Sequence, residues 1–96
     1  MAIVVVMQWP EVTRDQYEAV RKDIDWVADP PEGGLMHVAG FGETGFRVVD
    51  LWSSPEYFQK FVDAKLTPSV AKIGVKSQPE VAVFPADYVD VLAFSH

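Results

Sequence analysis

The 96-residue sequence contains no cysteine and only two histidines, His37 and His96. The absence of cysteine excludes disulfide bonds, thiol catalysis and thiolate metal sites. Zinc is usually held by about four ligands, drawn mainly from cysteine and histidine. We therefore expect no metal site in this protein.

Basic residues are also scarce, because 8 Lys and Arg stand against 14 Asp and Glu, for a net charge of −6. Surfaces that bind nucleic acid or anionic membranes need clustered Lys and Arg. The apolar run Ala2–Met7 is much shorter than the roughly 20 residues that span a bilayer, and no basic segment precedes it. We expect no nucleic-acid partner and no membrane association, and a cytoplasmic location.

The motifs that bind common cofactors are missing as well. The sequence has no Gly-x-Gly-x-x-Gly or phosphate-loop spacing, and no serine lies in a nucleophile-elbow context. Haem would need an axial ligand, for which only His37 is available within the predicted strands. The expectation is a protein without a cofactor.

What the chain does have is enough apolar content for one core. Hydrophobic residues make up 49% of the sequence and charged residues 23%, which is typical of a globular protein. Domains mostly contain about 50 to 250 residues, so residues 1–96 are interpreted as a single domain.

The first part of the chain predicts a strand followed by a helix. Ala2–Trp9 is rich in Val and Ile and ends at Pro10. Thr13 and Gln16 have the spacing of a capping box, which predicts a helix over Arg14–Ala28.

A hairpin comes next, after the helix-breaking loop Asp29–Gly34. Leu35–Phe41 and Phe46–Trp52 are predicted strands around the short turn Gly42–Gly45. A loop this short favours an antiparallel pair.

A second helix is predicted to begin at Ser54 and Pro55, because proline is tolerated in the first helical turn. Its apolar stripe is Phe58, Phe61, Val62 and Leu66. Pro68 is expected to interrupt this helix, with Thr67 capping a short further turn.

The rest of the chain predicts the fourth strand, Val81–Phe84, a bend at Pro85 and an extended tail, Tyr88–Phe94. The order of elements is then β-α-β-β-α-β, the ferredoxin-like α+β order, with a four-stranded antiparallel sheet.

The predicted strands are apolar on both faces, although two helices cover only one face of such a sheet. A strand with one solvated face normally alternates between apolar and polar residues. The second strand instead has Leu35, Ala39 and Phe41 on one side and Met36 and Val38 on the other. We therefore expect a homodimer that packs sheet to sheet, with the tail crossing to the partner or extending its sheet.

Two polar residues are predicted to face each other within the hairpin. Pairing that is symmetric about the turn places His37 opposite Asp50 and Leu35 opposite Trp52, with Cβ atoms about 5 Å apart. A carboxylate orients an imidazole and raises its basicity, which suits a general base. The pair is interpreted either as a catalytic or ligand contact or as a buried polar pair that satisfies itself.

Other polar side chains are weaker candidates for a functional site. Arg47 has the opposite parity, so it is predicted on the other face, near the rim or in a structural ion pair with a carboxylate of the partner. The alternative is that Arg47 binds an anionic group of a substrate. Tyr17, Tyr57 and Tyr88 each supply a hydroxyl, which needs a hydrogen-bond partner wherever it is buried.

The chain resembles the dimeric α+β-barrel superfamily that includes the antibiotic-biosynthesis monooxygenases, and it is most similar to small actinobacterial members of unknown function. The resemblance is carried by Gly34-Leu35-Met36-His37, by Gly45-Phe46-Arg47-Val48-Val49-Asp50-Leu51-Trp52 and by Ser54-Pro55-Glu56-Tyr57-Phe58. Many relatives have a His-Asn pair in the fourth-strand region, where this chain has Ala86-Asp87-Tyr88.

The resemblance implies cofactor-free chemistry on an aromatic or polyketide-like compound, with His37 removing a proton. On this hypothesis a small apolar or aromatic ligand lies between helices and sheet. His37 and Asp50 would be catalytic, and Trp52, Tyr17 and Tyr57 would contact the substrate. The alternative is a non-catalytic dimeric binding or structural protein, in which the same residues complete the core.

Overall fold

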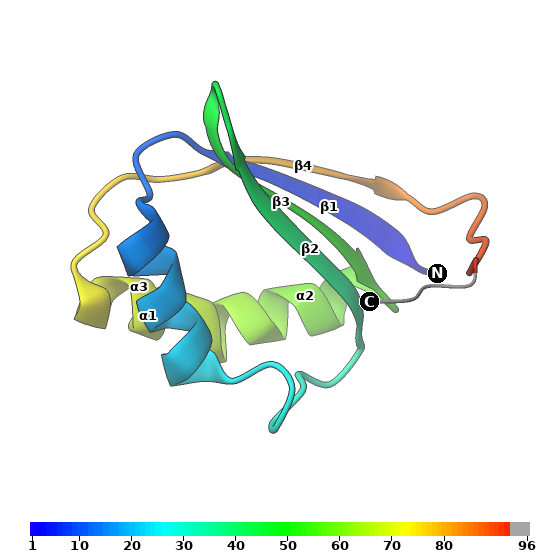
Figure 1. Cartoon of the computed structure of the whole chain (residues 1–96). Helices are drawn as coiled ribbons and strands as arrows, with labels where there is room; N and C mark the ends of the chain where they lie inside the picture. The colour runs from blue at the N-terminus through cyan, green and yellow to red at the C-terminus, as the bar shows by residue number, and fades with distance from the viewer. Residues whose placement is uncertain (93–96) are drawn as a thin grey trace.

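The computed structural model describes residues 1–92, which form a sheet with helices on one face (Figure 1). The strands are β1 (Ile3–Trp9), β2 (Gly34–Gly42), β3 (Gly45–Trp52) and β4 (Glu80–Pro85). They pair in the order β2-β3-β1-β4, and every neighbouring pair is antiparallel. The predicted ferredoxin-like order of elements is confirmed.

Helix α1 (Arg14–Ile24) begins with the predicted capping box. The Gln16 amide donates to Thr13 Oγ1 at 3.1 Å, and the Thr13 amide donates to Gln16 Oε1 at 3.0 Å. The predicted end at Ala28 was wrong, because Asp25 adopts a left-handed conformation with φ of 54°. Its carboxylate accepts the Ala28 amide at 3.2 Å, so a turn replaces the last helical turn.

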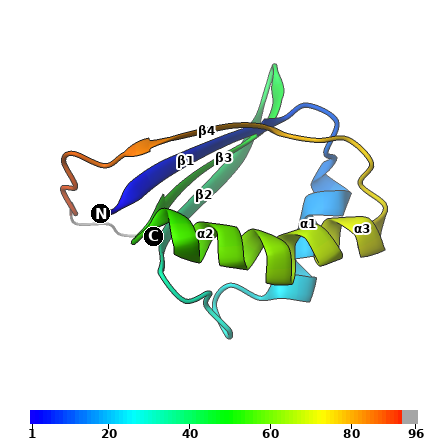
Figure 2. The same ribbon diagram turned by 180° about the vertical axis from the view of Figure 1, so that it is seen from behind.

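The second helical segment is continuous (Figure 2), and it contains one wide turn. It consists of α2 (Pro55–Phe61), the π-helical turn η1 (Val62–Leu66) and α3 (Thr67–Ile73). Ser54 caps its start as predicted, but Pro68 does not interrupt it and Thr67 is not a cap. The Thr67 amide instead bonds to the Val62 carbonyl, and this wider turn lets the chain continue through a residue that has no amide hydrogen.

The hairpin register agrees with the sequence prediction except at one position. His37 pairs with Asp50, Ala39 with Val48 and Phe41 with Phe46. The predicted pairing of Leu35 with Trp52 was wrong, because the register shifts between Gly34 and Met36 and Gly34 pairs with Trp52. Leu35 is the extra residue of this irregularity, and it is exposed.

The core lies between the sheet and the helices. Residues of the helix-facing side of β1 and β3 alternate with less buried neighbours, as half-buried strands do. The buried hydrophobic residues on the two strands are Ile3, Val5, Met7, Trp9, Phe46, Val48 and Trp52. The outer face of the sheet is uncovered in a single chain, and Val38 and Val49 on it are 54% and 44% exposed.

The tail after β4 differs in part from the prediction. The Ala86 amide still bonds to the Ala2 carbonyl at 2.9 Å, but residues 86–92 contain no regular strand. Tyr88 is 90% exposed, and Phe94, the predicted end of the tail, lies outside the described residues. No helix in the described part of the chain is long and apolar enough to cross a membrane.

Candidate functional site

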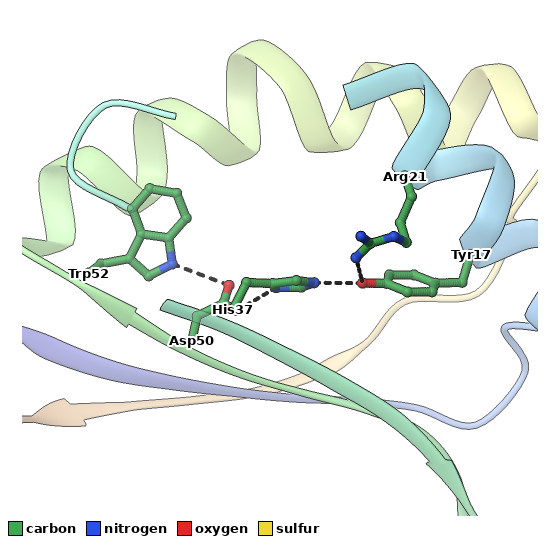
Figure 3. A network of polar contacts seen from close by, with 5 residues as sticks. All are labelled: Tyr17, Arg21, His37, Asp50 and Trp52. Atoms are coloured by element: carbon green, nitrogen blue, oxygen red, sulfur yellow. Dashed lines mark hydrogen bonds and ion pairs between the residues drawn. The ribbon is translucent and has the colours of Figure 1, made fainter. Parts of the chain in front are cut away.

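His37 and Asp50 meet on the helix-facing side of the sheet, where β2 lies beside β3 (Figure 3). Nδ1 of His37 lies 2.7 Å from Oδ1 of Asp50. The Asp50 side chain is 2% exposed and that of His37 is 16% exposed. Because they are partners in the strand ladder, backbone register alone brings the two side chains together.

Trp52 completes the environment of the carboxylate. It follows Asp50 by two residues on β3, so it shares the same face, and its indole Nε1 donates to Oδ2 of Asp50 at 3.2 Å. Each carboxylate oxygen therefore has a donor, which offsets the cost of burying a charge. The structure thus brings Trp52 to the His-Asp pair even though its own ladder partner is Gly34.

Tyr17 reaches the other side of the imidazole from helix α1. Its hydroxyl oxygen lies 2.6 Å from Nε2 of His37, and Nη1 of Arg21 donates to the same oxygen at 3.4 Å. A carboxylate only accepts hydrogen bonds, so Nδ1 of His37 carries the hydrogen directed at Asp50. In the neutral imidazole Nε2 is then an acceptor, and the hydroxyl of Tyr17 donates to it.

Burial raises the pKa of Tyr17 above its ordinary value of 10.0. The hydrogen bond from Arg21 acts in the opposite direction, and the nearby charge of Asp50 raises the pKa further. The phenol therefore keeps its proton at neutral pH and remains a donor toward His37.

Sequence reasoning missed Trp26, which stacks on the imidazole. The ring centroids of Trp26 and His37 are 4.3 Å apart, with an interplanar angle of 19°. Trp26 also contacts Phe61 at 4.9 Å between centroids. The available signal was a large aromatic residue just before Pro30, but the predicted helix ran on to Ala28 and its apolar stripe of Tyr17, Val20, Ile24 and Val27 did not include this position.

Sequence reasoning also missed Arg21, because it was interpreted only as part of the polar face of the first helix. It lies on the polar face of α1, one turn after Tyr17, where a basic residue usually indicates only a solvated surface.

Two hollows adjoin the His-Asp pair. The inner cavity, of about 30 Å³, is lined mainly by apolar residues from the sheet and both helical segments. The outer pocket, of about 210 Å³, lies between residues 30–31 and the start of β2. The side chains that line both are Trp26, His37 and Asp50.

The remaining candidates lie elsewhere. Tyr57 packs on Gly33, where an added Cβ would come within 2.4 Å of its ring, and it lines neither hollow. Arg47 lies on the outer face as predicted, and within the chain it donates to Oε1 of Gln8 at 3.2 Å. The ion pair with a carboxylate of a second copy stays a prediction. Within residues 1–92 no group of three or more His, Asp or Glu side chains is arranged to hold a metal ion.

No protein-family model and no curated protein sequence matches this chain. Solved structures do match. SnoaB, a cofactor-independent oxygenase from Streptomyces nogalater, has a TM-score of 0.62 at 14% identity, over 92% of this chain and 93% of that one. A dimeric ferredoxin-like protein of unknown function from Thermobifida fusca has a TM-score of 0.61 at 20% identity, over 88% and 90% of the two chains.

A third structure extends this comparison. The monooxygenase from the gene ActVA-Orf6 of Streptomyces coelicolor, in complex with nanaomycin D, has a TM-score of 0.55 at 15% identity, over 96% of this chain and 92% of that one. The chain therefore has a ferredoxin-like α+β fold, and solved structures with this fold include the cofactor-independent oxygenase SnoaB and the ActVA-Orf6 monooxygenase. Fold alone does not fix the chemistry.

Proposed function

We propose that this protein binds a small planar aromatic compound next to His37 and removes a proton from it, as the first step of a cofactor-independent oxygenation. The observation that carries the proposal is the buried pair of His37 and Asp50 on an otherwise apolar wall. Mostly apolar pockets with a few convergent polar groups are the usual form of small-molecule sites.

The geometry suits His37 to the role of base. Asp50 accepts the hydrogen bond from Nδ1, so Nε2 on the opposite side of the ring has the free lone pair. In the structure the Tyr17 hydroxyl lies against that lone pair. An acidic phenol or enol that reaches Nε2 takes the place of the Tyr17 hydroxyl as donor. Asp50 then stabilises the imidazolium that forms when the proton is transferred.

An aromatic substrate can itself supply the electrons that the reaction needs. Oxidation of an activated ring CH₂ to a carbonyl by one O₂ releases one molecule of water and needs no external reductant. The protein's part is to form the electron-rich anion in a site with little water. The cofactor-independent oxygenase SnoaB, with the same fold, supports this choice of reaction class.

Oxygen uptake tests the proposal directly. Hydroxylated two- to four-ring aromatic compounds are incubated with the purified protein, and O₂ consumption is followed with an electrode. We expect at least one compound to be consumed, at a rate that falls by about 100-fold or more in His37→Ala, the usual size of general-base effects. Equal rates in the variant, or no uptake with any compound, would overturn the proposal.

The alternative, a binding or structural protein without catalysis, is favoured by the size of the inner cavity. A volume of about 30 Å³ holds little more than one water molecule, so a ligand must displace side chains to enter. On this alternative aromatic compounds bind without O₂ uptake, or do not bind.

We also propose that the chain forms a homodimer through the outer face of its sheet. Apolar side chains are exposed there, including Met36, Val38 and Val49, and burying them against a second copy removes apolar surface from water. The Thermobifida fusca neighbour is described as dimeric, which supports the same assembly here.

Light scattering tests the dimer. The native protein should have a mass near twice 10.7 kDa, and Val49→Lys should give monomers. Val27→Lys is the matched control, because Val27 is 85% exposed and lies away from this face. A native monomer, or a Val49→Lys dimer of unchanged stability, would contradict the proposed interface.

A further inference from the structure

We propose that Trp26 is a removable plug: its indole occupies the place on His37 where a planar bicyclic aromatic ligand stacks, and its displacement joins the two hollows into one site. This inference rests on the proposed function, because it takes His37 as the ligand-contacting group. It adds the size and shape of the ligand and the residue that controls entry.

Position is the first argument. Trp26 lies against the ring of His37 and lines both the inner cavity and the outer pocket. The other side chains shared by the two hollows, His37 and Asp50, are fixed by strand register and by hydrogen bonds. Trp26 lies outside regular secondary structure, so it is the part of the shared wall that can move.

The polar contacts of the three tryptophans differ. Nε1 of Trp9 donates to Oγ of Ser77 at 2.8 Å, and Nε1 of Trp52 donates to Asp50. Nε1 of Trp26 is buried and has no hydrogen-bond partner within residues 1–92. A buried donor without a partner opposes the closed position, because it would regain hydrogen bonds on reaching water.

Residues 25–33, the segment that contains Trp26, form only weak ion pairs with the second helical segment. It runs between two residues with positive φ, Asp25 at 54° and Gly33 at 80°. Its ion pairs to the second helical segment, Asp29 with Lys65 at 3.8 Å and Glu32 with Lys60 at 3.5 Å, are exposed and therefore weak. Further free space, of about 320 Å³, lies between this segment and Phe61.

The space that the indole vacates defines the ligand. It is bounded by the rings of His37 and Phe61, whose centroids lie 4.3 and 4.9 Å from that of Trp26. Such a slot accepts a flat, two-ring aromatic molecule. 1-Naphthol, a flat two-ring compound, is therefore a suitable probe of this slot.

Binding of 1-naphthol is measured by titration calorimetry with the full-length protein, Trp26→Ala and Trp26→Phe. We expect Trp26→Ala to bind at least about tenfold more tightly than the native protein, because the plug no longer competes. Trp26→Phe should be intermediate. Tyr88→Ala should match the native protein, because Tyr88 is an exposed aromatic residue that lines neither hollow.

Hydrogen exchange of the indole N–H groups in the native protein provides a second measurement that needs no variant. The N–H of Trp26 should exchange at least about tenfold faster than those of Trp9 and Trp52, which serve as internal controls. Saturation with 1-naphthol should change the Trp26 signal most. Exchange as slow as that of the two hydrogen-bonded indoles would show that the plug does not open.

The outcomes separate the plug from the proposed function. If 1-naphthol binds the native protein and the Trp26 variants equally, the plug is refuted while the aromatic site stands. If no form binds it, the aromatic site fails together with the plug. Tighter binding by Trp26→Ala with fast exchange of the native Trp26 indole supports both.

Discussion

The hydroxyl of Tyr17 lies 2.6 Å from Nε2 of His37, and this contact joins helix α1 to the central hairpin. The helix supplies the hydroxyl and β2 supplies the imidazole, so their meeting depends on how the helix packs across the sheet. The contact therefore reports on the packing of the helix layer as well as on the candidate site.

Replacing Tyr17 with Phe should alter stability at high pH. Burial raises the pKa of Tyr17 above 10.0, so the folded protein retains a proton that the unfolded chain loses. The stability from this shift is complete below pH 10 and is lost as the pH rises through the folded-state pKa. Urea unfolding at pH values from about 9 to 11 should show a steeper decline for the native protein than for Tyr17→Phe. Parallel declines would refute the shift.

Replacing His37 with Ala should destabilise the fold by about 1–3 kcal/mol, because it leaves Oδ1 of the buried Asp50 without a donor. The free energy of unfolding from urea denaturation measures this loss. Glu43→Ala is a control on the same hairpin, with an expected change within about 0.5 kcal/mol, because Glu43 is exposed in the turn between β2 and β3. Equal effects would mean that the His-Asp contact does not contribute.

Replacing Gly45 with Ala should destabilise the hairpin by about 1–3 kcal/mol. Gly45 has φ of 102°, and a Cβ there would lie 2.6 Å from Cα of Pro10. Gly42→Ala is the matched control, because a Cβ at its paired position meets nothing within 4 Å. Thermal or urea unfolding should separate the two variants, and equal stability would argue against the backbone geometry of this turn.

Asp23 and Lys72 connect α1 to α3 with a contact of 2.7 Å. The hydrogen bond from Lys72 lowers the pKa of Asp23 below its ordinary value of 3.8. The stability gained from this shift is present above pH 3.8 and is lost as the pH falls through the folded-state pKa. Lys72→Met should therefore show a shallower loss of stability on acidification in urea unfolding experiments, and an unchanged acid profile would exclude the pairing in solution.

Removal of the residues after Pro85 should weaken the proposed dimer. The described part of this tail has exposed apolar side chains, with Val91 82% and Leu92 80% exposed in a single chain. Sedimentation at decreasing concentration should show the truncated protein dissociating before the native one. If both dissociate at the same concentration, the tail is not part of the interface.

The strands and the pairing of His37 with Asp50 were predicted correctly from the sequence, because both depend on local patterns. A two-residue loop between Gly42 and Gly45 determines the register, so the pairing of His37 with Asp50 follows from counting. Counting did not predict the exposed position of Leu35, because Leu35 is an extra, unpaired residue and shifts the register of the strand by one.

The contributions of Tyr17 and Trp26 to the site depend on packing between helices and sheet. Tyr17 was a candidate because of its hydroxyl, but periodicity does not say which strand residue a helix will contact. Trp26 was hidden by the helix prediction, since Asp25 ends α1 through a left-handed conformation that its residue type permits but does not require.

The wide turn at Val62–Leu66 has a consequence for the phase of the helical segment that follows it. In an uninterrupted α-helix, the residues seven and fourteen positions after Phe58, Lys65 and Lys72, would lie on the same face as Phe58. One additional residue in the turn places Leu66 and Ile73 on that face instead. Leu66 and Ile73 do pack against the core, and Lys72 is left free to reach Asp23. The one additional residue in the wide turn thus determines which side of α3 packs against the core and which side faces solvent.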